Sequence, residues 1–162
     1  MNLDLLFGTA TIVPDAIDGL AAAALRQRTF TRYGLLDRGS YEVSEGIAVP
    51  PAIVAHAAAA TGRTLAVVAS RLLCLRAGDY VLAHHDPLRD DNPVEIVLDL
   101  SPATVPGAEV CYRRRGQPFF RVPSAPGSLA IVERGPTVTS NHAYVSRQRP
   151  DAVVVRLIAL LG

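Results

Sequence analysis

Three side chains in this sequence are of the types that can hold one divalent metal ion. His84, His85 and Asp86 are consecutive and close an alternating, strand-like stretch. Residues two apart in a strand share a face, so His84 and Asp86 point one way and His85 the other. His142 follows a second short run, residues 137–141, and pairing of the two strands across a sheet would bring it beside the first pair.

Two imidazoles and one carboxylate on one side of a metal are the ligand set of non-haem Fe(II) oxygenases, which leave coordination positions open for other molecules. An H-x-D pattern is short, however, and these residues alone fit a zinc site or a polar cluster at a strand end as well. The fourth histidine, His56, falls inside an expected helix and is interpreted as structural or surface.

The elements that must position these residues change character along the chain. Two helices are expected near the start, at residues 16–28 and 52–61, with a polar loop or short strand at 29–46 between them. Short apolar runs bounded by Gly, Pro, Asn or Asp dominate from residue 64 onward, which indicates an antiparallel β-sandwich or barrel. The expected strands are residues 65–70, 72–75, 80–86, 94–100, 109–113, 119–122, 128–132 and 152–161.

We therefore predict a mainly β protein with N-terminal helices, in a single domain of residues 1–162. Residues 1–63 would form a helical support, and residues 64–162 a β core. A length of 162 residues suits one domain, and 49% hydrophobic against 19% charged residues excludes a disordered chain.

Composition also limits the partners and the compartment. Sixteen basic residues balance fifteen acidic ones, which argues against a dedicated nucleic-acid binder. Cys74 and Cys111 lie in apolar runs without a CxxC spacing, as free buried thiols in a reducing compartment do. The start of the chain lacks the positive region of a secretory signal, and charged or turn residues interrupt every apolar run before the ~20 residues of a membrane span. A cytoplasmic protein without membrane contact is expected.

Several motifs in order resemble the Fe(II)/2-oxoglutarate-dependent dioxygenase superfamily, in particular its prolyl-4-hydroxylase-like branch. Residues 73–86 resemble the approach to the first iron ligands, where a Gly-Asp turn, here Gly78-Asp79, leads by a short strand into H-x-D. Residues 94–110 and 122–132 resemble the strand, hairpin and proline-glycine turn that follow, and residues 141–145 resemble the distal histidine motif.

The resemblance implies a double-stranded β-helix, a jelly-roll or cupin-like fold, with Fe(II), 2-oxoglutarate and O₂ as cofactor and co-substrates. His84, Asp86 and His142 would be the metal ligands and catalytic residues. In this family 2-oxoglutarate is decarboxylated to succinate while an unactivated C–H bond of a second substrate is hydroxylated. The carboxylate of Asp86 argues against a halogenase, because that branch has a small residue there.

One departure concerns the basic residue that binds the far carboxylate of 2-oxoglutarate, because the position where this branch carries it falls near Ala152. Arg156 has the same strand parity and lies inside an apolar strand, where a guanidinium without an anionic partner would be costly. We therefore expect Arg156 to be the anchor, unless it faces solvent on an edge strand. Tyr80 and Arg149 are further candidates for binding the co-substrate.

The second substrate is expected to be a small or amino-acid-like molecule that contacts Tyr33, Arg38 and Tyr41 in the polar segment 29–46. The oligomeric state stays open, with a homodimer among the choices. Two other functions also stay open. One is a cupin-like metal enzyme that does not use 2-oxoglutarate, although the chain lacks the H-x-H pattern of cupins. The other is a non-enzymatic β-sandwich that binds a ligand.

Overall fold

A computed structural model describes residues 8–83, 91 and 93–162. Its elements are β1 (Ala10–Val13), α2 (Gly19–Arg26), β2 (Thr31–Leu35), β3 (Gly39–Glu45), α3 (Pro51–Thr61), β4 (Val67–Arg76), β5 (Tyr80–Val81), β6 (Val94–Asp99), β7 (Val110–Arg114), β8 (Gln117–Val122), β9 (Leu129–Glu133), β10 (Val138–His142) and β11 (Val153–Leu161).

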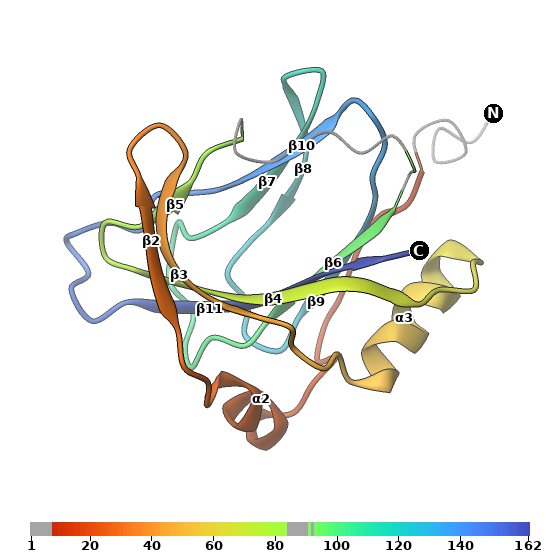
Figure 1. The fold of residues 1–162 in the computed structure, drawn as a ribbon, viewed down its shortest axis with the longest axis horizontal. Coiled ribbons are helices and arrows are strands. Elements are labelled where there is room, and N and C mark those ends of the chain that lie inside the picture. Colours follow the sequence, from red (N-terminus) through yellow and green to blue (C-terminus); the bar gives the residue numbers. More distant parts are fainter. Residues whose placement is uncertain (1–7, 84–90, 92) are drawn as a thin grey trace.

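The strands form one antiparallel sheet that curls into a nearly closed barrel. Its order is β1-β9-β6-β11-β4-β3-β5-β10-β7-β8, with β2 paired to β3 outside this path. Two layers face each other: β1, β9, β6, β11 and β4 form the first, and β5, β10, β7 and β8 form the second (Figure 1). Strand β3 pairs with both β4 and β5, and so joins the layers along one side.

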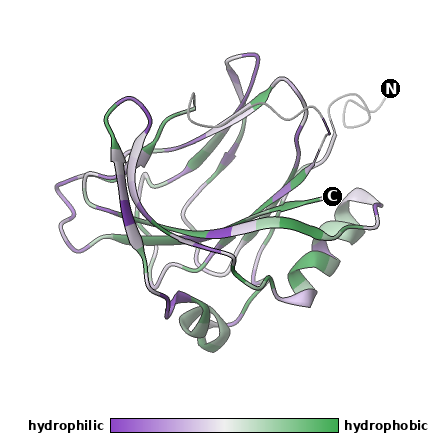
Figure 2. Cartoon of the chain, in the orientation of Figure 1, coloured by the Kyte–Doolittle hydropathy of each residue, from purple (hydrophilic) through white to green (hydrophobic). Residues whose placement is uncertain are grey.

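The two helices cover the outer face of the first layer (Figure 1). Helix α2 begins at Asp18, whose carboxylate accepts a hydrogen bond from the Ala21 N–H at 2.8 Å. Helix α3 has a proline in its first turn and ends at Gly62, which adopts a left-handed conformation with φ of 67°. Buried alanine and isoleucine side chains of both helices join the outer hydrophobic cluster, and Figure 2 shows the apolar character of α3.

A second hydrophobic cluster, the inner one, fills the space between the layers. The side chains of β11 alternate between the outer cluster and this inner cluster. Val155 and Leu157 join the outer cluster, whereas Val154 and Ile158 join the inner one. Arg156 has the parity of the inner pair, so its side chain enters the barrel interior. Arg156 is buried, as its place inside an apolar strand predicts, and the edge-strand alternative is wrong, since β11 pairs with β4 and β6 on its two sides.

Two sequence expectations for the first half of the chain need correction. The segment 29–46, expected to be a loop or a short strand, forms the two strands of the β2–β3 hairpin, because β3 pairs with β4 and β5, which no local sequence pattern predicts. The segment 1–63 therefore supplies three strands as well as two helices. Likewise, residues 67–70 and 72–75, expected as parts of two strands, belong to one strand, β4, which continues through Arg71.

Both cysteines are buried and form no disulfide, as predicted. Burial raises the pKa of the Cys74 thiol to about 11, so this thiol stays protonated at neutral pH. Within the part of the chain that the structure describes, neither helix has the length and apolar character that a membrane crossing requires.

Candidate functional site

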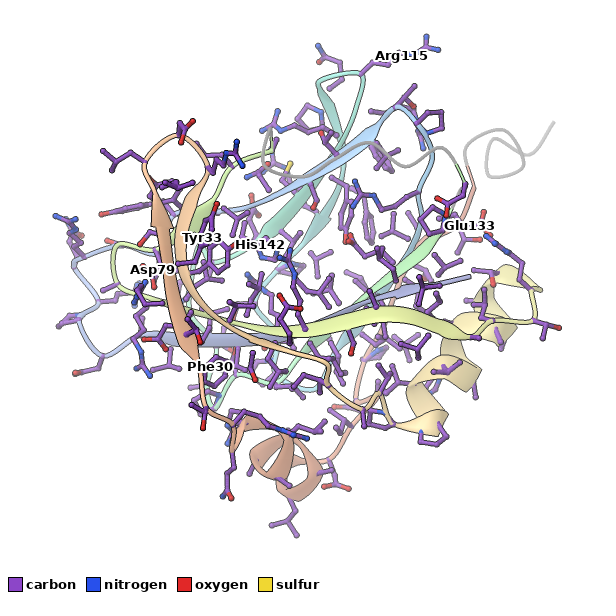
Figure 3. The ribbon with its side chains drawn as sticks, viewed as in Figure 1. Phe30, Tyr33, Asp79, Arg115, Glu133 and His142 are labelled. Carbon is purple, nitrogen blue, oxygen red and sulfur yellow. The ribbon has the colours of Figure 1, made fainter. Side chains whose placement is uncertain are left out.

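His142 is the last residue of β10 and lies in the middle of the second layer. It is the register partner of Val110 on β7 and of Val81 on β5, and it is 5% exposed. Figure 3 shows its side chain in the space between the layers. Burial lowers the pKa of His142 well below its usual value, and the positive charges of Arg156 and Arg71 lower it further. The imidazole is therefore neutral, which is the form that binds metal ions.

Arg156 reaches His142 from the opposite layer. Its Nη1 lies 3.0 Å from Nδ1 of His142, and its Nη2 donates to the Ala108 carbonyl at 2.8 Å. Burial lowers the pKa of Arg156 to about 10, while the nearby Asp99 raises it, so the guanidinium stays charged at neutral pH. A guanidinium can only donate hydrogen bonds, so Nδ1 of His142 is the acceptor. In this arrangement Nε2 carries the ring proton.

The other two predicted metal ligands, His84 and Asp86, lie outside the described residues, as does His85. The approach to them is described. Val81 is opposite His142, and the Leu82 N–H donates to the Arg38 carbonyl at 2.8 Å. The three residues from Val81 to His84 span about 10 Å when extended.

The chain between Val81 and the H-x-D segment is therefore short enough for that segment to share a metal ion with His142. The neutral, buried imidazole of His142 is in the form that binds a metal. Among residues 8–83, 91 and 93–162, no group of three His, Cys, Asp or Glu side chains could hold a metal. The fit thus depends on His84 and Asp86, which remain a prediction.

Arg71 is a site residue that the sequence interpretation missed. It lies on β4 with the parity of Leu73 and Leu75, both of which belong to the inner cluster. Its positive charge acts to lower the pKa values of both Tyr41 and His142, so it lies near both side chains. An arginine inside an apolar strand is the same signal that singled out Arg156, but here it was taken as a break between two short strands.

Two of the three predicted substrate-binding residues come together. The rings of Tyr33 and Tyr41 stack with centroids 4.9 Å apart and planes at 27°. Tyr41 belongs to the inner cluster and Tyr33 packs against it. Burial raises the pKa of Tyr41, although the positive charge of Arg71 opposes this shift. Arg38, the third residue, is exposed in the turn of the β2–β3 hairpin and meets β5 through its backbone carbonyl.

The two secondary candidates for co-substrate binding lie away from the His142–Arg156 pair. The hydroxyl of Tyr80 donates its hydrogen to the Leu36 carbonyl at 3.0 Å, so this hydrogen is used at the hairpin turn. Its ring packs against Tyr144, with centroids 6.5 Å apart. Arg149 is exposed between β10 and β11, where its N–H donates to the Ser146 carbonyl.

In the part of the chain that the structure describes, the site holds the charges of Arg71 and Arg156 against one buried carboxylate, Asp99, which is the register partner of Arg156. Arg71 and Arg156 form no ion pair with a described carboxylate. Elsewhere in the interior, Arg134 pairs with Glu95 at 3.2 Å, and the Tyr112 hydroxyl donates to Glu95 at 2.5 Å. Two guanidiniums beside a neutral imidazole favour anionic ligands.

Solved structures of other proteins have a similar fold. No protein-family model matches the sequence, and no curated protein matches it. An oxidoreductase of the 2OG-Fe(II) oxygenase family from Burkholderia pseudomallei superposes with a TM-score of 0.72 and 13% identity, covering 99% of this chain and 88% of that chain. A Pseudomonas putida prolyl-4-hydroxylase superposes with a TM-score of 0.66 and 15% identity, covering 98% and 94%.

The epimerase SnoN from nogalamycin biosynthesis, described as non-heme and alpha ketoglutarate dependent, is also similar. It superposes with a TM-score of 0.70 and 17% identity, covering 98% of this chain and 79% of that chain. SnoN has also been solved in complex with Fe3+, alpha ketoglutarate and nogalamycin RO. The chain thus has the jelly-roll fold of the 2OG-Fe(II) oxygenases, which confirms the fold that the sequence resemblance implied.

Proposed function

We propose that this protein is an Fe(II)- and 2-oxoglutarate-dependent oxygenase whose active site is carried by one domain of residues 1–162. The observation that carries the proposal is the contact between Arg156 and the neutral, buried His142 inside a jelly-roll barrel. The order of the sequence motifs supports it, as does the family of the similar structures.

His84, Asp86 and His142 are the proposed metal ligands. The support for this set is the pairing of Val81 with His142, which starts the H-x-D segment beside the end of β10. Bound Fe(II) would supply the O₂ chemistry that oxidises an unactivated C–H bond. The protein's part is to keep His142 neutral and to fix its ring between β5 and β7.

Arg156 is the proposed anchor for the far carboxylate of 2-oxoglutarate. A guanidinium matches a planar carboxylate with two parallel hydrogen bonds. Its side chain is buried, so a carboxylate bound there would be shielded from competing water. The inner cluster around it, with Leu73, Val154 and Ile158, excludes water from the same space.

The second substrate is proposed to be a small or amino-acid-like molecule whose C–H bond is hydroxylated. The stacked Tyr33 and Tyr41 would form part of its binding surface, since they face the interior from the hairpin. A bound small molecule is seen in one similar protein, SnoN, whose complex contains nogalamycin RO.

The proposal is tested by anaerobic titration of the Fe(II)-loaded protein with 2-oxoglutarate. A charge-transfer absorption band that saturates, and succinate formed once O₂ is admitted, are the expected results. Stoichiometric metal without the band would favour the cupin-like metal enzyme instead. Failure to bind Fe(II) at all would favour a ligand-binding β-sandwich.

A further inference from the structure

We propose that Arg71 binds a carboxylate of the second substrate, so that the substrates of this protein are small anionic molecules. The proposal rests on the proposed function, in which Arg156 takes the far carboxylate of 2-oxoglutarate. It adds a second anion site in the same barrel, on β4 instead of β11.

The first argument is the register of the two strands. Arg156 is opposite Leu73 and Arg71 is opposite Ile158, so the two arginines are diagonal neighbours on the inner face of adjacent strands. Diagonal neighbours in an antiparallel pair lie about 7–8 Å apart. Two like charges this close repel each other, and bound anions remove that cost. Both charges also reach His142, where each lowers the imidazole pKa.

The second argument is the surroundings of Arg71. Its positive charge acts on Tyr41, and Tyr41 stacks on Tyr33, so a cation lies near a wall of two stacked aromatic rings. Glu45 is its register partner on β3, but Glu45 is exposed and forms no ion pair with it among the described residues. A carboxylate attached to an apolar or aromatic body matches both the charge and the wall.

The third argument separates the roles of the two arginines. Arg156 is 2% exposed and lies against His142, the proposed metal ligand, where the co-substrate must bind. Arg71 is only half-buried and faces the hairpin, so a molecule entering from outside can reach it. In the proposed function 2-oxoglutarate binds the metal and Arg156, so Arg71 is left to bind the second substrate.

The test measures binding rather than turnover, on Zn(II)-loaded protein saturated with 2-oxoglutarate. The probes are phenylacetate, 3-phenylpropionate and 4-hydroxyphenylacetate, each compared with its carboxamide by calorimetry and saturation-transfer NMR. At least one carboxylate should bind the parent about tenfold or more tightly than its amide. Arg71→Gln should abolish that difference, and Arg71→Lys should restore part of it. Arg76→Gln, on the same strand but exposed, should leave the difference unchanged, and circular dichroism would check each fold.

The same variants are titrated with 2-oxoglutarate alone. Arg71→Gln should bind it within about threefold of the parent, whereas Arg156→Met should lose about 30-fold or more. The reverse ranking would make Arg71 the co-substrate anchor and overturn the inference. Equal binding of acids and amides, or no binding of any acid, would overturn it as well. If the parent fails to bind 2-oxoglutarate, the proposed function fails instead, a result that the first titration distinguishes.

Discussion

Nη1 of Arg156 lies 3.0 Å from Nδ1 of His142, so a residue of the last strand holds the ring that we propose as a metal ligand. The guanidinium donates, and Nε2 therefore carries the ring proton. A metal ion bound at Nε2 requires the proton on Nδ1, where it would face the hydrogens of Arg156. Metal binding at Nε2 and this hydrogen bond would exclude each other, so a bound metal would free Arg156 for a carboxylate.

Replacing Arg156 by Met should therefore act on the two ligands in opposite directions. Loss of the buried guanidinium removes a charge-assisted pair worth about 2–5 kcal/mol, so 2-oxoglutarate should bind about 30-fold or more weakly. Zn(II) affinity without 2-oxoglutarate should be equal or higher, because the competing hydrogen bond is gone. Calorimetry on the metal-free protein measures the Zn(II) constant, and calorimetry on the Zn(II)-loaded protein measures the 2-oxoglutarate constant.

Arg149→Gln is the matched control, since Arg149 is exposed between β10 and β11. It should change both constants by less than about threefold, as expected for a solvated surface charge. A larger loss of 2-oxoglutarate binding in this control than in Arg156→Met would move the anchor to that turn.

The metal ligands are tested by single Ala substitutions at His84, Asp86 and His142. Each should lower Fe(II) content from one per chain to well below half, because two ligands hold a divalent ion poorly without the third. Metal analysis after desalting gives the stoichiometry. His85→Gln is the control, since the sequence prediction turns His85 away from the metal, and it should keep full metal content. Full iron in all three Ala variants would place the site elsewhere.

The burial of Arg156 could be predicted because its neighbours along β11 are all apolar, but both faces of β11 are buried, so the sequence does not say which face the side chain shares. The contact with His142 could not, because it depends on how β10 and β11 are placed across the barrel. Arg71 was missed for a related reason. It interrupts an apolar run as Arg156 does, but an arginine between two short runs also resembles a strand end.

The β2–β3 hairpin was missed because its sequence has the glycines and charges of a loop. Its strands exist through pairing with β4 and β5, which are distant in sequence. Local composition carries no information about such partners. Tyr41 lies in the inner cluster and Tyr33 packs against it, while their contact with a substrate stays a prediction.

Asp79 should be a strong determinant of stability, because it ties the hairpin to the turn before the H-x-D segment. Its buried carboxylate accepts hydrogen bonds from Arg32 at 2.7 Å, from the Ser40 hydroxyl at 2.9 Å and from the Arg76 N–H at 2.8 Å. Asp79→Ala should lower the free energy of unfolding by about 2–3 kcal/mol, since charged hydrogen bonds and the Arg76 N–H lose their acceptor. Urea denaturation measures this change.

The comparison variant is Arg32→Ala, because the Arg32 side chain is 48% exposed while that of Asp79 is 6% exposed. Water replaces the guanidinium, so the loss should stay below about 1 kcal/mol. Equal losses in the two variants would show that the ion pair, and not the bonds to Ser40 and Arg76, holds the hairpin.

The metal-free protein should lose stability in acid because of His142. Its pKa in the folded state lies well below its usual value near 6.5, owing to burial and then to the charges of Arg156 and Arg71, which face it from β11 and β4. The unfolded chain therefore takes up a proton between these two pKa values, while the folded protein does not. Stability from this residue is complete above about pH 6.5 and is lost as the pH falls toward the folded pKa.

His142→Gln, whose amide oxygen can still accept from Arg156, removes this dependence. Urea denaturation in EDTA between pH 7.5 and pH 5 should show a steeper decline for the parent, by up to about 1.4 kcal/mol per pH unit. Parallel declines in the parent and the variant would mean that His142 is protonated in the folded protein, and a charged imidazole beside Arg156 would contradict the contact on which the proposed site depends.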